Sequence, residues 1–441
     1  MKINRLTIEN FKLFENRSFD FHPQFNLIVG INGSGKTTLL RAATVALGGW
    51  AHAYIQDPQN RRPIQDTEIR EVQKDKRFDK TSLISIKAEG TAIIIDRNQQ
   101  KKEGSIKWER TRKSIANDTI TSMQMAYKNV SSHYSKYYPI RFTSLGSDTL
   151  SYIEHVNTFD LPLIAVYECD RLWISTELSV EESVTTKYSR FDAYKDCFHT
   201  SADHKAIGQW LLKYQLAEAQ NQNGNETLEC IKIATCAALE GATSLRFDFE
   251  ESRVVVEFEN ERSIPFEHLS DGQRTTVGLF CDIARRASLL NPHLGKDACS
   301  KTPGVVLIDE LDLHLHPSWQ RRIVKYLRNT FPLIQFICTT HSPQLIGQVS
   351  PAEIIRLDKD QVSHPTQSLG MDSNWILQHV MNSDDRDPII ATEIDKLYQL
   401  IEEANFDLAR ELHLSLHQTI GEHPDLIEAN ALIERYTRFK D

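Results

Sequence analysis

A glycine-rich loop lies near the N-terminus of this chain, Gly30-Ile-Asn-Gly-Ser-Gly35-Lys36-Thr37. It follows an apolar run, Phe25 to Val29, which is typical of a buried strand, and it opens a segment of helical character from Lys36 to Leu47. The loop satisfies the pattern G-x-x-x-x-G-K-[ST], in which small residues let backbone N–H groups wrap phosphate oxygens. The helix N-terminus adds partial positive charge. The sequence therefore predicts a phosphate-binding strand–loop–helix unit.

Two residues of this loop have distinct expected roles. The Lys36 ammonium should reach the β and γ phosphates of a nucleotide, and the Thr37 hydroxyl should bind Mg²⁺. The full set of residues expected to hold the nucleotide here is Gly30, Asn32, Gly33, Ser34, Gly35, Lys36, Thr37 and Thr38.

A second motif pairs two carboxylates with a buried strand. The run Gly304-Val-Val-Leu-Ile is followed at once by Asp309 and Glu310, the arrangement of a Walker B motif. Asp309 is expected to hold Mg²⁺, which dehydrates reluctantly and prefers few carboxylate ligands. Glu310, one step further on, is expected to orient or deprotonate the attacking water.

A third segment, Leu269 to Arg274, precedes an amphipathic run from Thr276 to Leu290. Ser270 is a good helix cap there, and the helix N-terminus again offers an anion site. Read alone, Ser270-Asp271-Gly272 is more often a simple helix-starting turn. Two helix-terminal phosphate sites in one chain nevertheless suggest one nucleotide held between them.

These motifs, in this order, resemble those of ABC-type ATPases. Gly30 to Thr37, Leu269 to Arg274 and Val305 to Glu310 are similar to the Walker A, signature and Walker B elements. Leu311-Asp312 with Leu315-His316-Pro317, and then Thr340-His341-Ser342, are similar to the D-loop and switch-histidine elements. The class includes RecF, the chromosome-maintenance proteins and the ATPase lobes of overcoming-lysogenisation-defect nucleases.

The resemblance implies that two copies sandwich two ATP molecules. Ser270, Gly272 and Gln273 would then bind the nucleotide held by the other copy, whereas His341 would contact the γ-phosphate bound by its own copy. Asp271 departs from the commoner Leu-Ser-Gly-Gly-Gln form of the signature. Gln65 is the candidate for the family's Q-loop glutamine and for a further metal contact. Arg171 resembles a position in related ATPases, although a surface arginine fits equally well.

The predicted organisation is an α/β ABC-type head with a P-loop mixed or parallel sheet, an antiparallel β subdomain, a helical insertion and a C-terminal helical tail. The expected divisions are an ATPase N-lobe with the Walker A loop and a β meander (1–175), a helical insertion (176–240), an ATPase C-lobe (241–365) and a helical docking segment (366–441). Strand-like runs at Ser82 to Ala88, Ala92 to Arg97 and Ser105 to Trp108 predict the meander. Stripes of apolar residues at helical spacing mark the tail.

The chain has neither the long heptad-patterned insertion of chromosome-maintenance proteins nor a visible nuclease domain. In its compact architecture and short helical tail, the chain is similar to the PtuA-like ATPases of Septu antiphage defence and related retron systems. That resemblance implies ATP and Mg²⁺ as cofactors, a homodimer or higher homo-oligomer, and a separate HNH-type nuclease as partner. The alternatives are a RecF-like DNA-repair ATPase that acts on DNA directly, and a nucleotide-gated scaffold in which turnover is not essential.

Composition bears on location more than on partners. A net charge of -9 argues against non-specific coating of nucleic acid. The run from Arg97 to Lys113, with Trp108 inside it, could still contact DNA or could equally be a solvated strand edge. No apolar segment reaches the ~20 residues of a membrane span, and the seven scattered cysteines suggest no disulfide framework or zinc site. A cytoplasmic protein that does not bind membranes is expected.

Overall fold

The computed structural model describes residues 1–51, 62–75, 77–95, 101–114, 118–125, 160–169, 189–198, 204–220, 226–358, 361–383 and 387–438. The chain divides into two units, Met1–Asp372 and Ser373–Asp441, and each is treated separately below. The first unit, the head, contains both expected carboxylates and the glycine-rich loop.

The centre of the head is a six-stranded sheet in the order β16-β15-β3-β14-β13-β9. All neighbouring pairs are parallel except β15 and β16. The strands of this sheet are β3 (Phe25–Val29), β9 (Leu163–Tyr167), β13 (Gly304–Ile308), β14 (Ile334–Thr339), β15 (Ile354–Leu357) and β16 (Val362–Ser363). β3, β9, β13 and β14 are buried along their whole length, as expected for parallel strands covered on both faces.

In the C-terminal half of the head, helices alternate with the parallel strands. Between β13 and β14 lie α9 (Pro317–Gln320) and α10 (Ile323–Thr330), and between β14 and β15 lie α11 (Pro343–Ile346) and the 3₁₀ turn η6 (Pro351–Glu353). Because consecutive parallel strands need such crossovers, the carboxyl ends of β13 and β14 meet at one edge of the sheet. The two expected acids follow β13 at that edge.

An antiparallel sheet forms the other half of the head, in the order β2-β1-β6-β7-β8. Its strands are β1 (Lys2–Phe11), β2 (Phe14–Asp20), β6 (Leu83–Ile95), β7 (Lys101–Lys113) and β8 (Ile120–Met125). The separate strands expected at Ser82 to Ala88 and Ala92 to Arg97 are wrong, because β6 runs without a break from Leu83 to Ile95; Arg97 lies outside the described residues. A Cβ at Gly90 would lie 2.2 Å from the Lys2 carbonyl oxygen, so glycine there lets β1 pass close to an unbroken β6.

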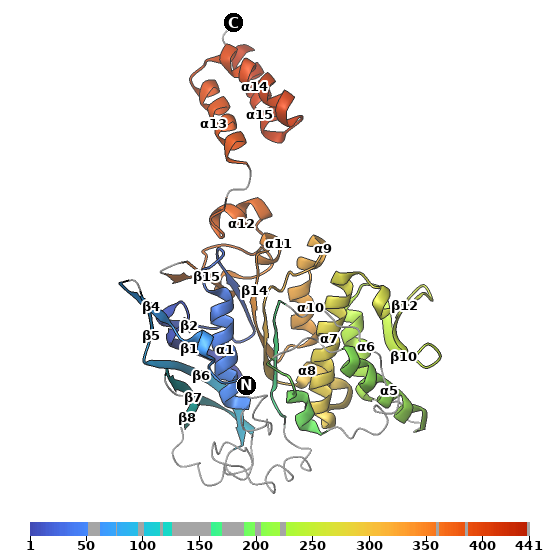
Figure 1. Cartoon of the computed structure of the whole chain (residues 1–441). Helices are drawn as coiled ribbons and strands as arrows, with labels where there is room; N and C mark the ends of the chain where they lie inside the picture. The colour runs from blue at the N-terminus through green and yellow to red at the C-terminus, as the bar shows by residue number, and fades with distance from the viewer. Residues whose placement is uncertain are drawn as a thin grey trace. The chain divides into compact units, whose positions relative to one another are not determined.

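Helix α1 (Lys36–Ala51) lies between the two sheets and contacts both (Figure 1). It is rich in alanine and leucine, which favour helix and pack closely, and nearly all its residues are buried. The η2 turn (Asp66–Glu68) and the hairpin of β4 (Glu71–Lys74) and β5 (Arg77–Lys80) follow it in the sequence.

The remaining part of the head is built around α7 (Asp271–Leu290), which packs against β9, α5, α6 and η3. A three-stranded antiparallel sheet, β10-β11-β12, precedes it in the sequence. The other elements are η3 (Arg190–Tyr194), α5 (His204–Gln220), α6 (Glu226–Ala238), β10 (Ala242–Asp248), β11 (Arg253–Phe258), β12 (Ser263–Pro265), η4 (Phe266–His268), η5 (Pro292–Asp297) and α8 (Ala298–Lys301).

One cysteine pairing differs from expectation. Cys230 on α6 and Cys299 on α8 form a disulfide, with Cα atoms 6.1 Å apart. The two residues are 69 positions apart in the sequence, so their spacing shows no recognisable motif. Only the packing of α6 against α8 brings them together.

The second unit, the tail, contains α12 (Ser373–His379) and three longer helices, α13 (Pro388–Glu402), α14 (Phe406–Ile420) and α15 (Pro424–Arg438). The predicted stripes form its own core, which includes Ile394, Leu397, Leu426 and Ile433. Leu426 and Ile433 are 1% exposed and therefore cannot form a docking surface, whereas Leu408 on α14 is 55% exposed. None of the helices in the described part of the chain is both long and apolar enough to cross a membrane.

Candidate functional site

The glycine-rich loop joins the end of β3 to the start of α1. Gly33 and Gly35 have φ values of 79° and 102°, a region that glycine adopts without strain. A Cβ at Gly35 would lie 2.9 Å from the ring of Phe14, and one at Gly30 would lie 2.4 Å from the Leu357 carbonyl oxygen. Side chains are therefore excluded at both ends of the loop, which leaves its backbone free to curve around a ligand.

Lys36 closes this loop from inside. Its Nζ donates hydrogen bonds to the carbonyl oxygens of Gly30, at 2.8 Å, and Ile31, at 3.0 Å. Burial lowers the pKa of Lys36, and the carboxylates of Asp309 and Glu310 act in the opposite direction. The ammonium is thus held at the loop and faces the two acids.

Ser34 supplies the clearest sign that the loop is shaped for phosphate. Its hydroxyl is buried and has no hydrogen-bond partner among the residues that the structure describes. Because buried polar atoms are normally paired, an orphaned hydroxyl inside a glycine-rich loop fits an incoming phosphate oxygen. The other expected loop residues Asn32 and Gly33 are exposed, whereas Thr38 is buried on α1.

Asp309 lies directly beside the loop, at the carboxyl end of β13. Its Oδ2 accepts a hydrogen bond from the Thr37 hydroxyl at 3.2 Å, and its backbone N–H donates to the Tyr167 carbonyl at 2.8 Å. The side chain is nearly buried, at 4% exposure of the residue. A hydroxyl and a carboxylate side by side are hard oxygen donors, which fit Mg²⁺ in the presence of nucleotide phosphates.

Glu310 adopts an unusual backbone conformation, with φ of 50°. Such left-handed residues are uncommon outside glycine and cluster at functional sites. The Glu310 N–H donates to the Thr339 hydroxyl at 2.7 Å, and that hydroxyl donates to Asp309 Oδ1 at 2.6 Å. Thr339 is therefore bonded to both acids, a role that the sequence analysis missed.

Cys169 was also missed. It follows β9, and its thiol donates to Asp309 Oδ2 at 3.3 Å. One signal could have identified both residues: the carboxyl ends of parallel strands lie at one edge of the sheet, so the residues at or just after the ends of β9 and β14 lie near those that follow β13. The strand order was not available from the sequence.

The expected switch histidine follows β14 and is half-buried. Asp312 holds this segment, because its Oδ1 accepts hydrogen bonds from the Thr340 hydroxyl, at 2.5 Å, and from the His341 N–H, at 3.4 Å. The D-loop segment after β13 and the histidine after β14 are thus tied together. His316 caps α9 by accepting a hydrogen bond from the Ser318 N–H.

The expected signature residues lie at the start of α7. Ser270 is the N-cap of this helix, forms a capping box with Gln273, and is exposed. A Cβ at Gly272 would lie 2.5 Å from the His314 carbonyl oxygen, so the helix start packs closely on the segment after Glu310. The Ser270 side chain therefore caps α7 and is exposed at the start of this helix.

Gln65 and Arg171 were the remaining candidate site residues. Gln65 is exposed at the start of η2, where its N–H donates to the Glu68 carboxylate at 2.9 Å. The contacts of the Thr37–Asp309 pair described above do not include it. Arg171 lies outside the described residues.

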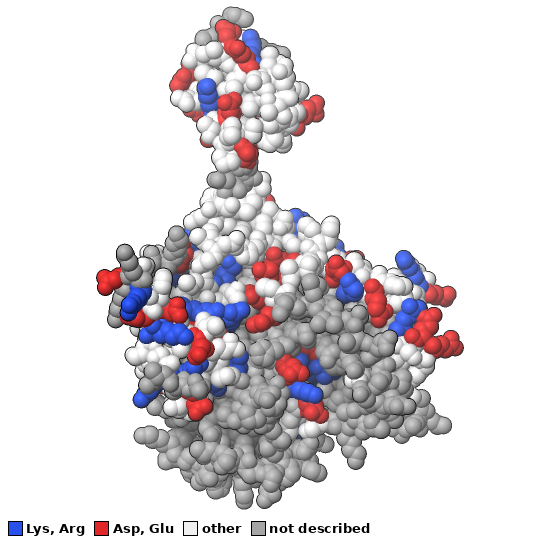
Figure 2. All heavy atoms as spheres, in the orientation of Figure 1, with Lys and Arg blue, Asp and Glu red and all other residues white. Residues whose placement is uncertain are grey.

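The basic run of β7 is less available to DNA than its sequence suggests. Arg110 and Arg112 are 3% and 6% exposed, and they point into the head, where they donate to the carbonyl oxygens of Arg62 and Ile64. Lys107 is paired with Glu89 at 2.7 Å. On the face drawn in Figure 2, the coloured basic and acidic side chains are intermixed.

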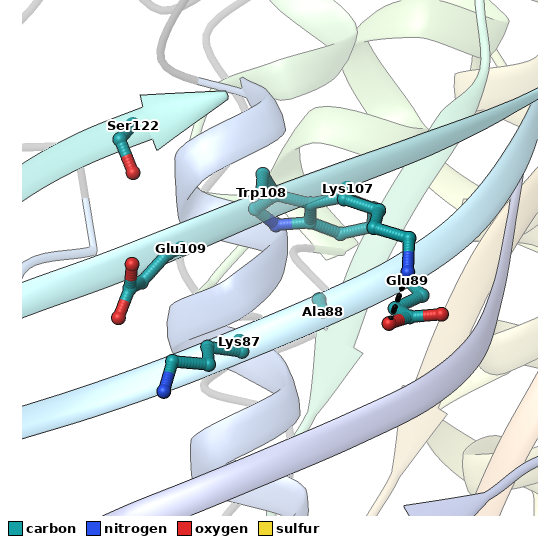
Figure 3. A pocket seen from close by; sticks show the side chains of 7 residues that line it. All are labelled: Lys87, Ala88, Glu89, Lys107, Trp108, Glu109 and Ser122. Atoms are coloured by element: carbon teal, nitrogen blue, oxygen red, sulfur yellow. Dashed lines mark hydrogen bonds and ion pairs between the residues drawn. The ribbon is translucent and has the colours of Figure 1, made fainter. Parts of the chain in front are cut away.

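A shallow pocket of about 250 Å³ lies on this antiparallel sheet. Figure 3 shows its lining residues on adjacent strands, with Lys107 and Glu89 joined across them. A further lining residue, Lys87, pairs with Glu9 at 2.7 Å, and Glu109 accepts a hydrogen bond from Ser85 at the same distance. The charged groups of this pocket are therefore already paired within the sheet.

A glycine-rich loop, an adjacent acid pair and a parallel sheet with α1 packed behind the loop define a P-loop nucleotide-binding protein. The AAA-domain family matches residues 5–235, and a second AAA-domain family matches residues 204–347. The chain belongs to the AAA-domain family, and it is an ABC-type AAA ATPase that resembles PtuA.

Curated relatives carry related names. The chain is 27% identical to "Retron Ec83 probable ATPase" of Escherichia coli, over 99% of this chain and 87% of that protein. It is 26% identical to "Retron Vc95 probable ATPase" of Vibrio cholerae serotype O1 biovar El Tor, over 80% and 73%. It is 25% identical to "Septu protein PtuA" of Bacillus thuringiensis, over 58% and 68%.

Among solved structures, the chain is similar in fold to an SMC head bound to the C-terminal winged-helix domain of ScpA. That match has a TM-score of 0.48 and 14% identity, and it covers 84% of this chain and 99% of that one.

Proposed function

We propose that this protein binds ATP with Mg²⁺ and hydrolyses it, and that it works as the ATPase subunit of a bacterial antiphage defence complex. The observation that carries the first part is the contact between the glycine-rich loop and the acid pair: the Thr37 hydroxyl lies 3.2 Å from Asp309 Oδ2. Lys36 is held at the same loop, and the Ser34 hydroxyl is unpaired within the described part of the chain. Bound Mg²⁺ would neutralise phosphate charge in this pocket.

Within that pocket the chain's own residues divide the work. Lys36 and the loop N–H groups would bind the phosphates, and Thr37 and Asp309 would hold the metal. Glu310 would orient the attacking water and accept its proton. His341, held by Asp312 through its backbone, would contact the γ-phosphate from the neighbouring strand end.

We further propose that Ser270, Gly272 and Gln273 complete the pocket of a second copy. The support is that Ser270 caps a 20-residue helix while its side chain stays exposed. A helix N-terminus is favourable for negatively charged phosphate. A homodimer, or a higher multiple built from such pairs, would then contain two complete pockets.

The biological part of the proposal rests on the relatives. The two retron ATPases and the Bacillus thuringiensis Septu protein described above match 58% to 99% of this chain. The similarity to PtuA-like ATPases suggests that a separate HNH-type nuclease carries out DNA cleavage in the cytoplasm, under control of the nucleotide state. The proposed domains of the chain are the ATPase N-lobe (1–175), the helical insertion (176–240), the ATPase C-lobe (241–365) and a helical segment (366–441) that docks a partner or another copy.

The test combines two variants of the purified protein. Glu310→Gln should slow ATP hydrolysis by about 100-fold or more, because general base catalysis contributes on that order, and should accumulate an ATP-bound dimer in analytical ultracentrifugation. Lys36→Ala should weaken nucleotide binding itself. Unchanged hydrolysis by Glu310→Gln would overturn the catalytic assignment. Full phage protection by a hydrolysis-deficient Glu310→Gln variant would favour the nucleotide-gated scaffold.

A further inference from the structure

Thr339, the last residue of β14, lies between the two acids of the site. Its hydroxyl donates a hydrogen bond to Asp309 Oδ1 at 2.6 Å and accepts one from the Glu310 N–H at 2.7 Å. The residue is 1% exposed, so water does not compete for these bonds. One hydroxyl thus connects the expected metal ligand to the backbone of the expected general base.

The bond to Asp309 determines where that carboxylate points. Oδ1 faces Thr339, whereas Oδ2 faces the Thr37 hydroxyl at 3.2 Å. Because a carboxylate is planar, holding Oδ1 also sets the direction of Oδ2. Partners of this kind, one step removed from a metal, orient ligands and tune metal affinity.

The bond to Glu310 supports a strained turn. Glu310 has φ of 50°, and such a conformation persists only where its surroundings hold it in place. Thr339 contacts this turn twice, because its carbonyl oxygen also accepts a hydrogen bond from the Leu311 N–H at 2.9 Å. The turn directs the Glu310 side chain, so its position depends on the neighbouring strand β14.

We propose that Thr339 is a positioning residue of the hydrolytic centre, which sets both the metal-facing oxygen of Asp309 and the placement of Glu310. This inference rests on the proposed ATPase function and adds to it a residue outside the Walker A, Walker B and signature motifs. A purely structural threonine would contribute to stability alone. A positioning threonine controls Mg²⁺ dependence and turnover as well.

The decisive comparison uses Thr339→Val, which keeps the shape of the side chain but removes the hydroxyl, and Thr339→Ser, which keeps the hydroxyl. Both are made in the Glu310→Gln background, and binding of a fluorescent ATP analogue is measured while Mg²⁺ is titrated. For Thr339→Val, the Mg²⁺ concentration at half-maximal binding should rise about 10- to 100-fold, the usual loss for such partners. Thr339→Ser should stay near the parent, and both should bind the analogue equally in EDTA.

Turnover gives a second readout with Glu310 intact. Thr339→Val should lower kcat by about tenfold or more, with the KM for ATP nearly unchanged at saturating Mg²⁺. Thr235→Val is the matched control, because Thr235 is a fully buried threonine on α6 whose hydroxyl donates to the Ile231 carbonyl. It should leave the Mg²⁺ dependence and kcat as they are.

Two results would overturn the inference: a Thr339→Val protein with unchanged Mg²⁺ dependence and kcat, or a Thr339→Ser protein as impaired as Thr339→Val. If Thr339→Val does not fold, Thr339→Ser and Thr339→Ala make the same comparison, since both lack the methyl group and only serine has the hydroxyl. A parent protein without Mg²⁺-dependent hydrolysis would instead contradict the proposed function, independently of Thr339.

Discussion

At the scale of single residues, Cys169 offers a direct probe of the nucleotide pocket. It is half-buried, and its thiol lies 3.3 Å from Asp309 Oδ2. Bound MgATP would cover this edge of the sheet. We therefore predict that iodoacetamide modifies Cys169 in the free protein and that Mg²⁺ with a non-hydrolysable ATP analogue slows this modification by about tenfold, as expected when reactivity follows access. Peptide mass spectrometry measures the rate.

Other cysteines serve as controls in the same experiment. Burial raises the pKa of Cys197 and of Cys281 to about 12, so both should stay unmodified at pH 8 with or without nucleotide. Cys236 is exposed on α6, and its rate should not depend on nucleotide. Modification of Cys169 at one rate in both conditions would place the nucleotide elsewhere.

Single residues also show where sequence reasoning stopped. Lys36, Thr37, Asp309 and Glu310 could be predicted because each stands at a fixed offset from an apolar strand. Thr339 could not, since its importance comes from the parallel pairing of β13 with β14, which brings together residues 30 positions apart. A sequence motif contains residues that are close along the chain, whereas this hydrogen bond joins residues that are close only across the folded sheet.

At the scale of elements, α7 is fastened to the central sheet by a buried ionic network. Asp282 accepts hydrogen bonds from the Tyr167 hydroxyl on β9, at 2.8 Å, and from Arg286, at 2.7 Å, and it is also paired with Arg285. Arg286 in turn donates to the carbonyl oxygens of Ala193 and Lys195. The helix that begins at the signature is therefore tied to the strand that ends beside Asp309.

This network predicts a pH-dependent contribution to stability. Burial alone would raise the pKa of Asp282, but Arg286 and Arg285 outweigh it and hold that pKa well below its usual range. A carboxyl with a lowered folded-state pKa stabilises the fold above its unfolded pKa of about 3.9, and loses this effect as the pH falls further. Asp282→Asn should therefore cost about 3 to 5 kcal/mol at pH 7.

Urea unfolding of the two proteins at several pH values measures this effect. The difference in unfolding free energy should be constant from pH 7 to about pH 5 and should shrink below about pH 4. A difference that stays the same down to pH 3 would show that packing, not charge, accounts for the loss.

Strands and helices could be predicted where a single sequence pattern, such as an apolar run beside a glycine-rich loop, marks their ends. The buried strands β3 and β13 and the helix α1 were expected, because apolar runs and a glycine-rich loop mark their ends. The unbroken β6 was not, since Gly90 looks like a turn in the sequence but serves a close approach of β1. The Cys230–Cys299 disulfide was also missed, because the sequence does not show which helices pack together.

At the scale of the whole molecule, the head and the tail each have their own core. The tail buries Ile394, Leu397 and Ile433 among its own helices, and the glycine-rich loop and acid pair belong to the head. Removing residues 373–441 should therefore leave the affinity for a fluorescent ATP analogue within about twofold, because a unit with its own core can fold alone. If the tail is the docking segment, the same deletion should abolish co-purification of the nuclease. A shortened protein that no longer binds nucleotide would contradict this division.

We propose above that a complete hydrolytic pocket needs two copies of the chain. The most direct test of this claim mixes a Lys36→Ala protein, which lacks phosphate binding, with a Ser270→Arg protein, whose signature is blocked. Each alone should be nearly inactive, whereas an equal mixture should recover about a quarter of the parent rate, since half of the random dimers contain one intact pocket out of two. Hydrolysis at the parent rate by the Ser270→Arg protein alone would contradict the claim.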